Sequence, residues 1–157
     1  MQGIVPFLWF ENQAEEAATF YTSLFRNSRI VSVARNGEDG PGQAGAAFMV
    51  TFELDGREYM ALNGGPHYKL NPAFSLVVKC ADQVEVDHYW TKLLEGGGQE
   101  SMCGWLRDRY GVSWQVIPNA LSELVSDPDA DKAGRAMAAM LQMKKIDIAK
   151  LQQAYDG

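Results

Sequence analysis

Cysteine and histidine are scarce in this chain, and their scarcity excludes several kinds of site. The 157 residues include two cysteines, Cys80 and Cys103, and two histidines, His67 and His88. Two cysteines are too few for a disulfide scaffold or a zinc cluster. We therefore interpret both as reduced structural thiols, because free cysteine in folded proteins is commonly buried.

The chain also lacks an excess of basic charge and any long hydrophobic run. Its net charge is -6, and lysine and arginine are scattered along it. Such a chain does not attract phosphate backbones, so we expect no nucleic-acid partner. No apolar run approaches the roughly 20 residues that span a bilayer, and residues 1–11 lack a basic signal-peptide region. We expect a cytoplasmic protein with no membrane partner.

The first half of the chain predicts one strand, one helix and three further strands. Residues 4–10 are apolar like a buried strand, and Asn12 with Glu15 resembles a capping box that starts a helix. The next apolar side chains fall on one helical face, namely Ala14, Ala17, Ala18, Tyr21, Leu24 and Phe25. Strands are then expected over residues 29–34, 46–54 and 58–63, with a hairpin turn at Asp55-Gly56.

The second half repeats this order. Residues 73–79 predict a strand, Asp82 with Glu85 a second capping pair, and residues 96–98 a glycine-rich helix end. Short strands are expected near Gln99 and over residues 103–107 and 112–117, with a turn at residues 108–111. Residues 20–25 and 89–94 also share an aromatic pair, Thr and Leu, and the same offset pairs Pro6 with Ser75. These matches predict an internal duplication.

We therefore predict an α+β fold in which two βαβββ modules form a curved mixed sheet around a cleft, followed by a C-terminal helical tail. Residues 1–157 would form a single domain, with halves at 1–66 and 72–118 and the tail at 119–157. Helices are expected in the tail over residues 121–125, 129–143 and 146–155. The methionine-rich tail suits core packing, a dimer contact or a lid over the cleft, and the sequence does not choose among them.

Six stretches resemble the PhnB-like branch of the vicinal oxygen chelate superfamily, a group often labelled 3-demethylubiquinone-9 3-methyltransferase. The resemblance covers almost the whole chain. It implies paired βαβββ modules, a homodimer, and a cleft whose enzyme members bind a divalent metal. The stretches are residues 6–10, 61–66, 71–76, 85–90, 102–118 and 143–148.

The same resemblance places the metal ligands on the first, fourth, fifth and eighth strands. Here those positions fall on Pro6, on Ala61 or Asn63, on Ser75 and on Gln115. Proline and alanine side chains have no donor atom, serine is a poor ligand, and a lone glutamine amide binds divalent ions weakly. We therefore expect no metal and no cofactor at this site.

A glycine-rich segment, residues 40–45, matches the G-x-G-x-x-G pattern of dinucleotide-binding turns. The residues after it are patterned as a strand, so no helix N-terminus would be present to receive a phosphate. We interpret the segment as a flexible loop. Because no other glycine-rich turn joins a strand to a helix, the residues do not support the methyltransferase label.

Alternation along the last strand places Ser113 and Gln115 on one face and Trp114 on the other. Trp114 is then a core residue, and Trp105 is a candidate for the cleft. We expect Asp108 to fix the turn at residues 108–111 through its own backbone contacts.

Two functions from different classes follow. The first is the binding of a small organic molecule in a metal-free cleft lined by Asn63, Ser75, Trp105 and Gln115. The alternative is a superfamily enzyme, such as a lyase, isomerase, dioxygenase or transferase, with an unusual metal site or with metal-free acid/base chemistry. Its candidate acid/base groups are His67 in a loop and Glu53 on a strand, whereas His88 lies beside an apolar helical stripe and is expected to be structural.

Overall fold

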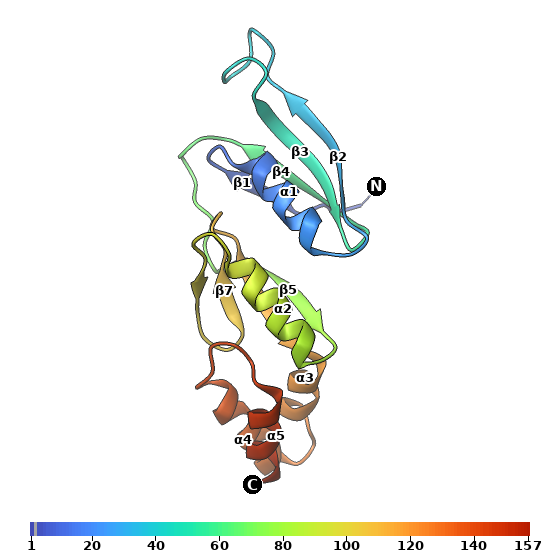
Figure 1. Ribbon diagram of the computed structural model, residues 1–157, viewed down its shortest axis with the longest axis vertical. Coiled ribbons are helices and arrows are strands. Elements are labelled where there is room, and N and C mark those ends of the chain that lie inside the picture. Colours follow the sequence, from blue (N-terminus) through green and yellow to red (C-terminus); the bar gives the residue numbers. More distant parts are fainter. Residues whose placement is uncertain (2) are drawn as a thin grey trace. The chain divides into compact units, whose positions relative to one another are not determined.

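The computed structural model describes residue 1 and residues 3–157. The fold is α+β, as the sequence predicted, and the chain divides into two compact units, Met1–Leu70 and Asn71–Gly157. Each unit contains its own four-stranded mixed sheet (Figure 1). The boundary falls between the expected halves at 1–66 and 72–118, while the single domain over 1–157 stays a prediction.

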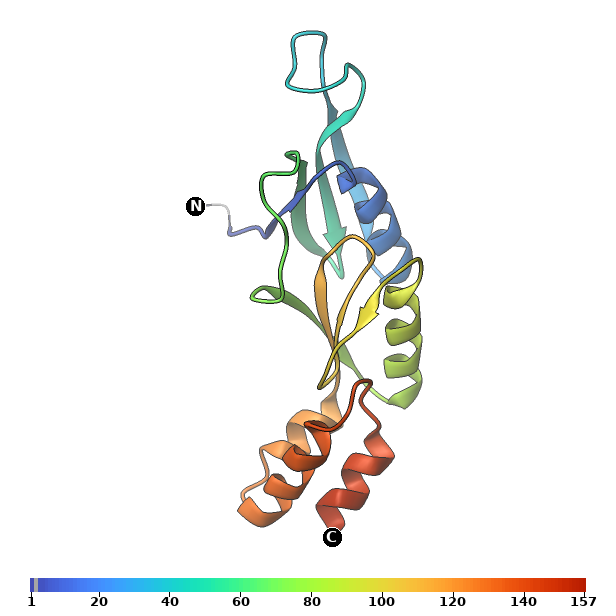
Figure 2. The ribbon, with the colours of Figure 1, turned by 90° about the vertical axis from the view of Figure 1, so that its left-hand side faces the viewer.

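Unit 1 has the predicted order of strand, helix and three strands. Its elements are β1 (Phe7–Phe10), α1 (Ala14–Leu24), β2 (Arg29–Arg35), β3 (Ala47–Leu54) and β4 (Arg57–Asn63). The strand order is β1-β4-β3-β2, with β1 parallel to β4 and the other pairs antiparallel. Helix α1 packs on one face of this sheet, as Figure 2 shows.

The alternation of side chains along β1 decides which residues meet α1. Leu8 and Phe10 are buried, whereas Phe7 is 51% exposed and Trp9 is half-buried. Successive residues of a strand point to opposite faces, so Phe7 and Trp9 lie on the face away from the helix. The buried core of the unit also contains Ala14, Ala17, Ala18, Tyr21, Val50, Phe52, Leu54 and Ala61.

Two local predictions for unit 1 can be compared with the structure. The hairpin turn at Asp55-Gly56 is confirmed, with φ values of 49° and 73° that suit a type I′ turn. The capping box of Asn12 and Glu15 is wrong, because the N-cap is Gln13 and makes no side-chain capping hydrogen bond. The Ala14 N–H at the start of the helix instead donates to the side chain of Asn63 from β4, a contact that no local pattern could reveal.

Unit 2 repeats the topology of unit 1. Its elements are β5 (Ser75–Cys80), α2 (Gln83–Leu94), β6 (Gln99–Glu100), β7 (Trp105–Arg107) and β8 (Ser113–Pro118), and the strand order is β5-β8-β7-β6. The predicted cap of α2 is confirmed, since the Asp82 carboxylate accepts a hydrogen bond from the Glu85 backbone N–H at 3.0 Å. Helix α2 packs against β5, β7 and β8.

The repeat is confirmed at the level of elements, but the pairing of Pro6 with Ser75 is wrong by one residue. In β5, Cys80 is buried on the helix side and Val77 is 51% exposed. Even-numbered residues therefore face the helix in both β1 and β5, so Ser75 faces away from the helix and cannot match Pro6, whose even position belongs to the helix side. The connection from strand to helix is one residue longer in unit 1, which shifts the match between strands relative to that between helices.

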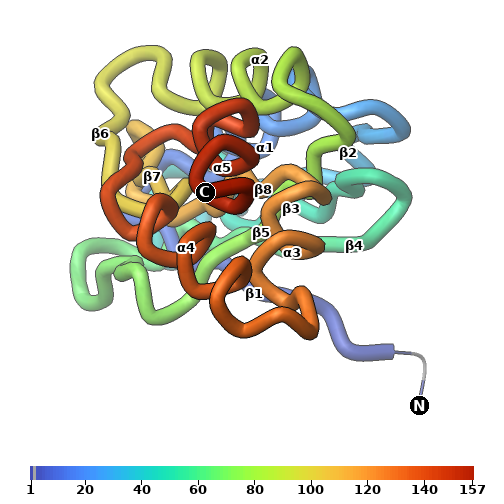
Figure 3. The backbone as a smooth tube through the Cα atoms, turned by 90° about the horizontal axis from the view of Figure 1, so that it is seen from below, coloured from blue at the N-terminus to red at the C-terminus, as the bar shows by residue number. Residues whose placement is uncertain are grey.

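The C-terminal tail forms three helices that pack into unit 2. They are α3 (Asn119–Val125), α4 (Ala130–Met140) and α5 (Ile148–Asp156), and Figure 3 looks onto them from their end of the chain. Leu121, Ile146 and Leu151 are buried together and contact Ile117 of β8. For these side chains the structure shows core packing. Among the described residues, no helix is both long and apolar enough to cross a bilayer.

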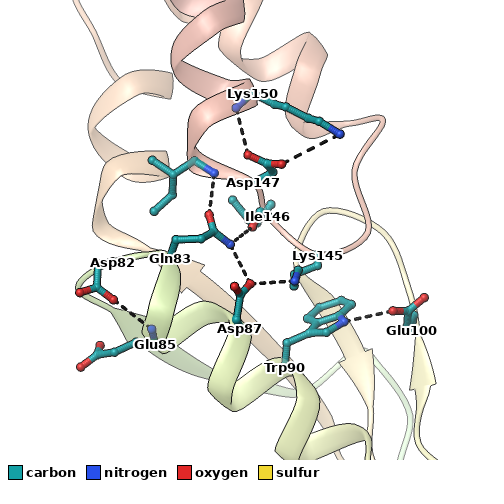
Figure 4. Close-up of polar contacts among 11 residues, drawn as sticks. Asp82, Gln83, Glu85, Asp87, Trp90, Glu100, Lys145, Ile146, Asp147 and Lys150 are labelled. Carbon is teal, nitrogen blue, oxygen red and sulfur yellow. Dashed lines mark hydrogen bonds and ion pairs between the residues drawn. The ribbon is translucent and has the colours of Figure 1, made fainter.

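A polar cluster attaches the segment between α4 and α5 to α2 (Figure 4). The Gln83 side chain donates to the Ile146 carbonyl at 3.0 Å and accepts from the Ile148 N–H at 2.9 Å. It also donates to Asp87, whose carboxylate forms an ion pair with Lys145 at 2.7 Å. Hydrogen bonding to Lys145 and then to Gln83 lowers the pKa of Asp87. The tail is thus held by side chains whose partners lie far away in sequence.

Asp108 organises the turn between β7 and β8, as predicted. Its side chain is only 3% exposed and accepts hydrogen bonds from the backbone N–H groups of Tyr110 at 2.8 Å and Val112 at 3.0 Å. Its second oxygen accepts from the Trp114 indole N–H at 2.8 Å. Trp114 is 2% exposed, which confirms it as a core residue. One carboxylate therefore fixes both the turn and the orientation of the core tryptophan.

Replacing Asp108 should destabilise the protein far more than replacing a solvent-exposed cap. Asp108→Ala removes the acceptor for three donors and leaves the buried Trp114 N–H unsatisfied, so we expect a loss of about 3 to 5 kcal/mol in the free energy of unfolding. The matched control Asp82→Ala removes one exposed helix cap and should cost about 1 kcal/mol. Urea unfolding followed by circular dichroism measures both, and equal losses would contradict this role of Asp108.

Candidate functional site

The face of the unit 2 sheet opposite α2 brings together three of the four predicted site residues. Strand register places Gln115 on β8 directly between Val77 on β5 and Trp105 on β7. Ser75 points to the same face, because it lies two residues before Val77 on the same strand. We call this surface, defined by Ser75, Val77, Trp105 and Gln115, the open face of unit 2.

A hydrogen bond joins two of these residues. The Gln115 side-chain N–H donates to the Ser75 hydroxyl oxygen at 2.9 Å, and both residues are half-buried. Trp105 is also half-buried and is the cross-strand neighbour of Gln115. Alternation placed Gln115 on one face of the last strand, and the family resemblance grouped it with Ser75. The contact between Ser75 and Gln115 depends on pairing between distant strands and was not foreseen.

Val77, Gln115 and Trp105 lie side by side across three strands, and we call them the central row of this face. The charged residues of the face lie outside this row. Lys79 and Arg107 are both exposed and occupy the rows on either side of Gln115. The Arg107 guanidinium donates to the Gln99 side-chain oxygen at 2.7 Å. The central row therefore consists of the neutral residues Val77, Gln115 and Trp105.

Asn63, the fourth predicted residue, belongs to unit 1 and is used there as a structural link. Its side-chain oxygen accepts a hydrogen bond from the Ala14 N–H at 2.8 Å, and its side-chain N–H donates to the Ala47 carbonyl at 3.0 Å. Strand register pairs it with Phe10, a residue that faces α1. The amide of Asn63 thus connects the end of β4 to the start of α1.

The open face of unit 1 contains an aromatic residue that sequence reasoning left aside. Trp9 shares a row with Leu62 and Met49, and its indole N–H donates to the Gly65 carbonyl at 2.9 Å. A Cβ on Gly64 would lie 2.3 Å from the Trp9 ring, so only glycine fits there. Tyr68 meets the same ring edge-on, with centroids 5.0 Å apart. Trp9 is therefore held in a fixed orientation.

The positions expected for metal ligands do not fit a metal. Ala61 is fully buried on the helix side of β4, and its two neighbours that face away from α1 are the apolar Met60 and Leu62. Ser75 and Gln115 are neutral and bonded to each other. Among residue 1 and residues 3–157, no cluster of three or more His, Cys, Asp or Glu side chains could hold an ion.

Both histidines are exposed, Glu53 is paired with an arginine, and both cysteines are free. His67 is exposed in the loop after β4, and His88 is exposed on α2, where its ring meets the Tyr89 ring at 5.0 Å. Glu53 forms an ion pair with Arg29 at 2.9 Å. Both cysteines are free, and burial raises the pKa of the Cys80 thiol to about 12, which makes it a poor nucleophile at neutral pH.

A family model described as 3-demethylubiquinone-9 3-methyltransferase matches residues 2–117. The PhnB protein from Bacillus cereus is 42% identical, with a TM-score of 0.69 over 74% of this chain and 99% of that chain. The chain belongs to this family. Membership confirms the predicted resemblance to PhnB-like proteins. Helices α3 to α5 lie outside the family match.

More distant structures share the fold alone. Protein PA1353 from Pseudomonas aeruginosa is 22% identical, with a TM-score of 0.61 over 75% of this chain and 98% of that chain. The fosfomycin resistance protein FosX from Mesorhizobium loti is 13% identical, with a TM-score of 0.56 over 81% of this chain and 99% of that chain. A search of curated proteins finds no match.

The turns between strands and helices in this chain do not support the methyltransferase activity that the family's description names. The connections from strand to helix are residues 11–13 and 81–82, and neither contains glycine. The segment at residues 40–45 leads into strand β3, which confirms it as a loop. A phosphate or methyl-donor site of the dinucleotide type needs a glycine-rich turn at a helix N-terminus.

Asn63→Ala should lower the free energy of unfolding by about 1 to 2 kcal/mol, because the first turn of α1 loses its acceptor and the Ala47 carbonyl loses its donor. Asn12→Ala is the matched control, since Asn12 is exposed and does not cap the helix, and it should change stability by less than about 0.5 kcal/mol. Urea titrations measure both, and a larger loss for Asn12 than for Asn63 would refute this assignment of the cap.

The two thiols should differ sharply in reactivity. Cys80 is fully buried with a raised pKa, whereas Cys103 is half-buried. With iodoacetamide at pH 8, mass spectrometry should find one fast modification at Cys103 and little at Cys80, and both should react in urea. Because the Cys80 thiol stays protonated until the pH approaches about 12, raising the pH to 9 should not make it react with iodoacetamide. Equal labelling of the native protein would contradict this.

Proposed function

We propose that this protein binds a small organic molecule, without a metal or other cofactor, in a cleft lined by the open face of unit 2. The observation that carries the proposal is the Ser75–Gln115 hydrogen bond beside Trp105, on the sheet face that α2 does not cover. Binding sites combine apolar walls with a few placed polar groups, which is the chemistry of this surface.

The proposal gives each residue a separate task. Trp105 offers a large aromatic surface, and Ser75 and Gln115 offer hydrogen bonds that fix the orientation of a ligand. Asn63, the fourth residue predicted for the cleft, faces α1 in unit 1, where its bonds to Ala14 and Ala47 hold it, so the proposed binding surface does not include it. None of these groups is charged, so the proposed role is binding and requires no acid or base.

We also propose that the protein is a cytoplasmic homodimer. Phe7 is 51% exposed and Tyr68 is 68% exposed, and both lie near Trp9 in unit 1. Association with a second copy would remove such apolar surface from water, and a two-fold dimer is the commonest way to do so. Two free thiols suit a reducing compartment.

Native mass spectrometry combined with elemental analysis of the untagged protein tests this proposal. The expected result is a dimer with no stoichiometric metal and an additional small organic mass. One iron, zinc, manganese or nickel per subunit would contradict the metal-free site. The binding function would be contradicted if the protein carries no organic mass and if no member of a panel of bicyclic aromatic compounds raises its melting temperature.

Substitutions at the open face should separate binding from folding. Trp105→Leu and Gln115→Leu should each remove the organic mass, or the melting-temperature increase, while leaving the circular dichroism spectrum unchanged. His88→Ala is the control, since His88 is exposed on α2 and outside the proposed site. Retention of the ligand by both site variants would exclude this face as the binding surface.

A further inference from the structure

The Ser75–Gln115 pair has a defined hydrogen-bonding capacity beyond the bond that joins its members. The Gln115 N–H donates to the Ser75 oxygen at 2.9 Å. A serine hydroxyl can also donate one hydrogen bond, and a glutamine carbonyl oxygen can accept. The pair therefore offers a ligand at least one donor, from the Ser75 hydroxyl, and an acceptor, from the Gln115 carbonyl oxygen.

This capacity does not depend on which way the Gln115 amide is turned. Exchanging its nitrogen and oxygen reverses the bond, so that the Ser75 hydroxyl donates to Gln115. The Gln115 NH₂ group then supplies the donor to the ligand, and the Ser75 oxygen supplies the acceptor. In both orientations the pair presents at least one donor beside an acceptor.

The surroundings of the pair favour a flat ligand. Trp105 is the antiparallel cross-strand neighbour of Gln115, and such neighbours have Cβ atoms about 4.5–5.5 Å apart. A ring stacked on Trp105 would therefore lie next to the Gln115 amide. Val77, 51% exposed, lies on the other side of Gln115, and Arg107 is engaged by Gln99.

From this geometry we infer that the ligand is a planar ring with a lactam edge, in which an N–H group adjoins a carbonyl. Such an edge donates one hydrogen bond and accepts one, and so it complements the Ser75–Gln115 pair in either amide orientation. The inference rests on the proposed function and specifies the chemical class that the same site would select. A site that hydrogen-bonds a ligand N–H discriminates against analogues that lack it, because its own acceptor is then left unsatisfied.

The test uses 2-quinolinone, a fused bicyclic lactam, and N-methyl-2-quinolinone, which lacks the donor. The full-length protein with ¹⁵N-labelled tryptophan gives indole N–H signals in NMR spectra, and Trp105→Phe identifies the signal of Trp105. We expect 2-quinolinone to shift this signal in a saturable way, and the N-methyl compound to bind at least about tenfold more weakly.

Variants then assign the discrimination to the pair. Ser75→Ala and Gln115→Leu should each reduce the preference for 2-quinolinone to less than about threefold, because one of the two complementary groups is lost. Arg107→Gln is the control outside the central row and should leave the preference unchanged. Urea unfolding of each variant verifies that the fold is retained.

Each other outcome overturns the inference in a distinguishable way. Equal binding of the two quinolinones at Trp105 would refute the lactam edge but leave the binding function in place. Tighter binding of quinoline-2-carboxylate, weakened by Arg107→Gln, would show that the face selects anions. No shift with any of the three compounds would also refute the lactam class, while an organic mass that copurifies with the protein would still support the proposed function.

Discussion

The structure depends on one constraint, which is that each four-stranded sheet has the helix of its own βαβββ module packed on one of its faces. In unit 1 the helix α1 covers Leu8, Phe10 and Ala61, and in unit 2 the helix α2 covers Cys80 and the strands beside it. Because side chains alternate along a strand, every residue that supports the core has neighbours that point to the opposite face. The core of each unit and its candidate binding surface are therefore set by the same register.

Duplication makes the two open faces comparable, and their chemistry differs. The central row of unit 1 contains Trp9, Leu62 and Met49, whereas that of unit 2 contains Val77, Gln115 and Trp105. Each row has one tryptophan, but only unit 2 has a polar side chain at the middle position. One repeat thus retains an apolar surface, and the other places a hydrogen-bonding pair beside an aromatic ring.

Local patterns in the sequence predicted the elements and most of the turns, because periodicity, caps and turn residues act over a few positions. Asp55-Gly56, Asp82 and Asp108 are in this class. The start of α1 is not, since its partner Asn63 lies 49 residues away. The same holds for Gln83 and the tail, and for Ser75 and Gln115, whose contacts exist only once strands and helices have paired. Alternation placed Gln115 on a face but could not identify its neighbour.

The most direct test is a crystal structure of the full-length protein with the small molecule that it retains, or with a soaked bicyclic ligand. We expect density for a flat ring against Trp105, with polar atoms of the ligand in hydrogen-bonding contact with Ser75 and Gln115 and no metal ion beside them. A ligand bound elsewhere, with Trp105 and Gln115 covered by protein, would contradict the central claim that the open face of unit 2 is the binding surface.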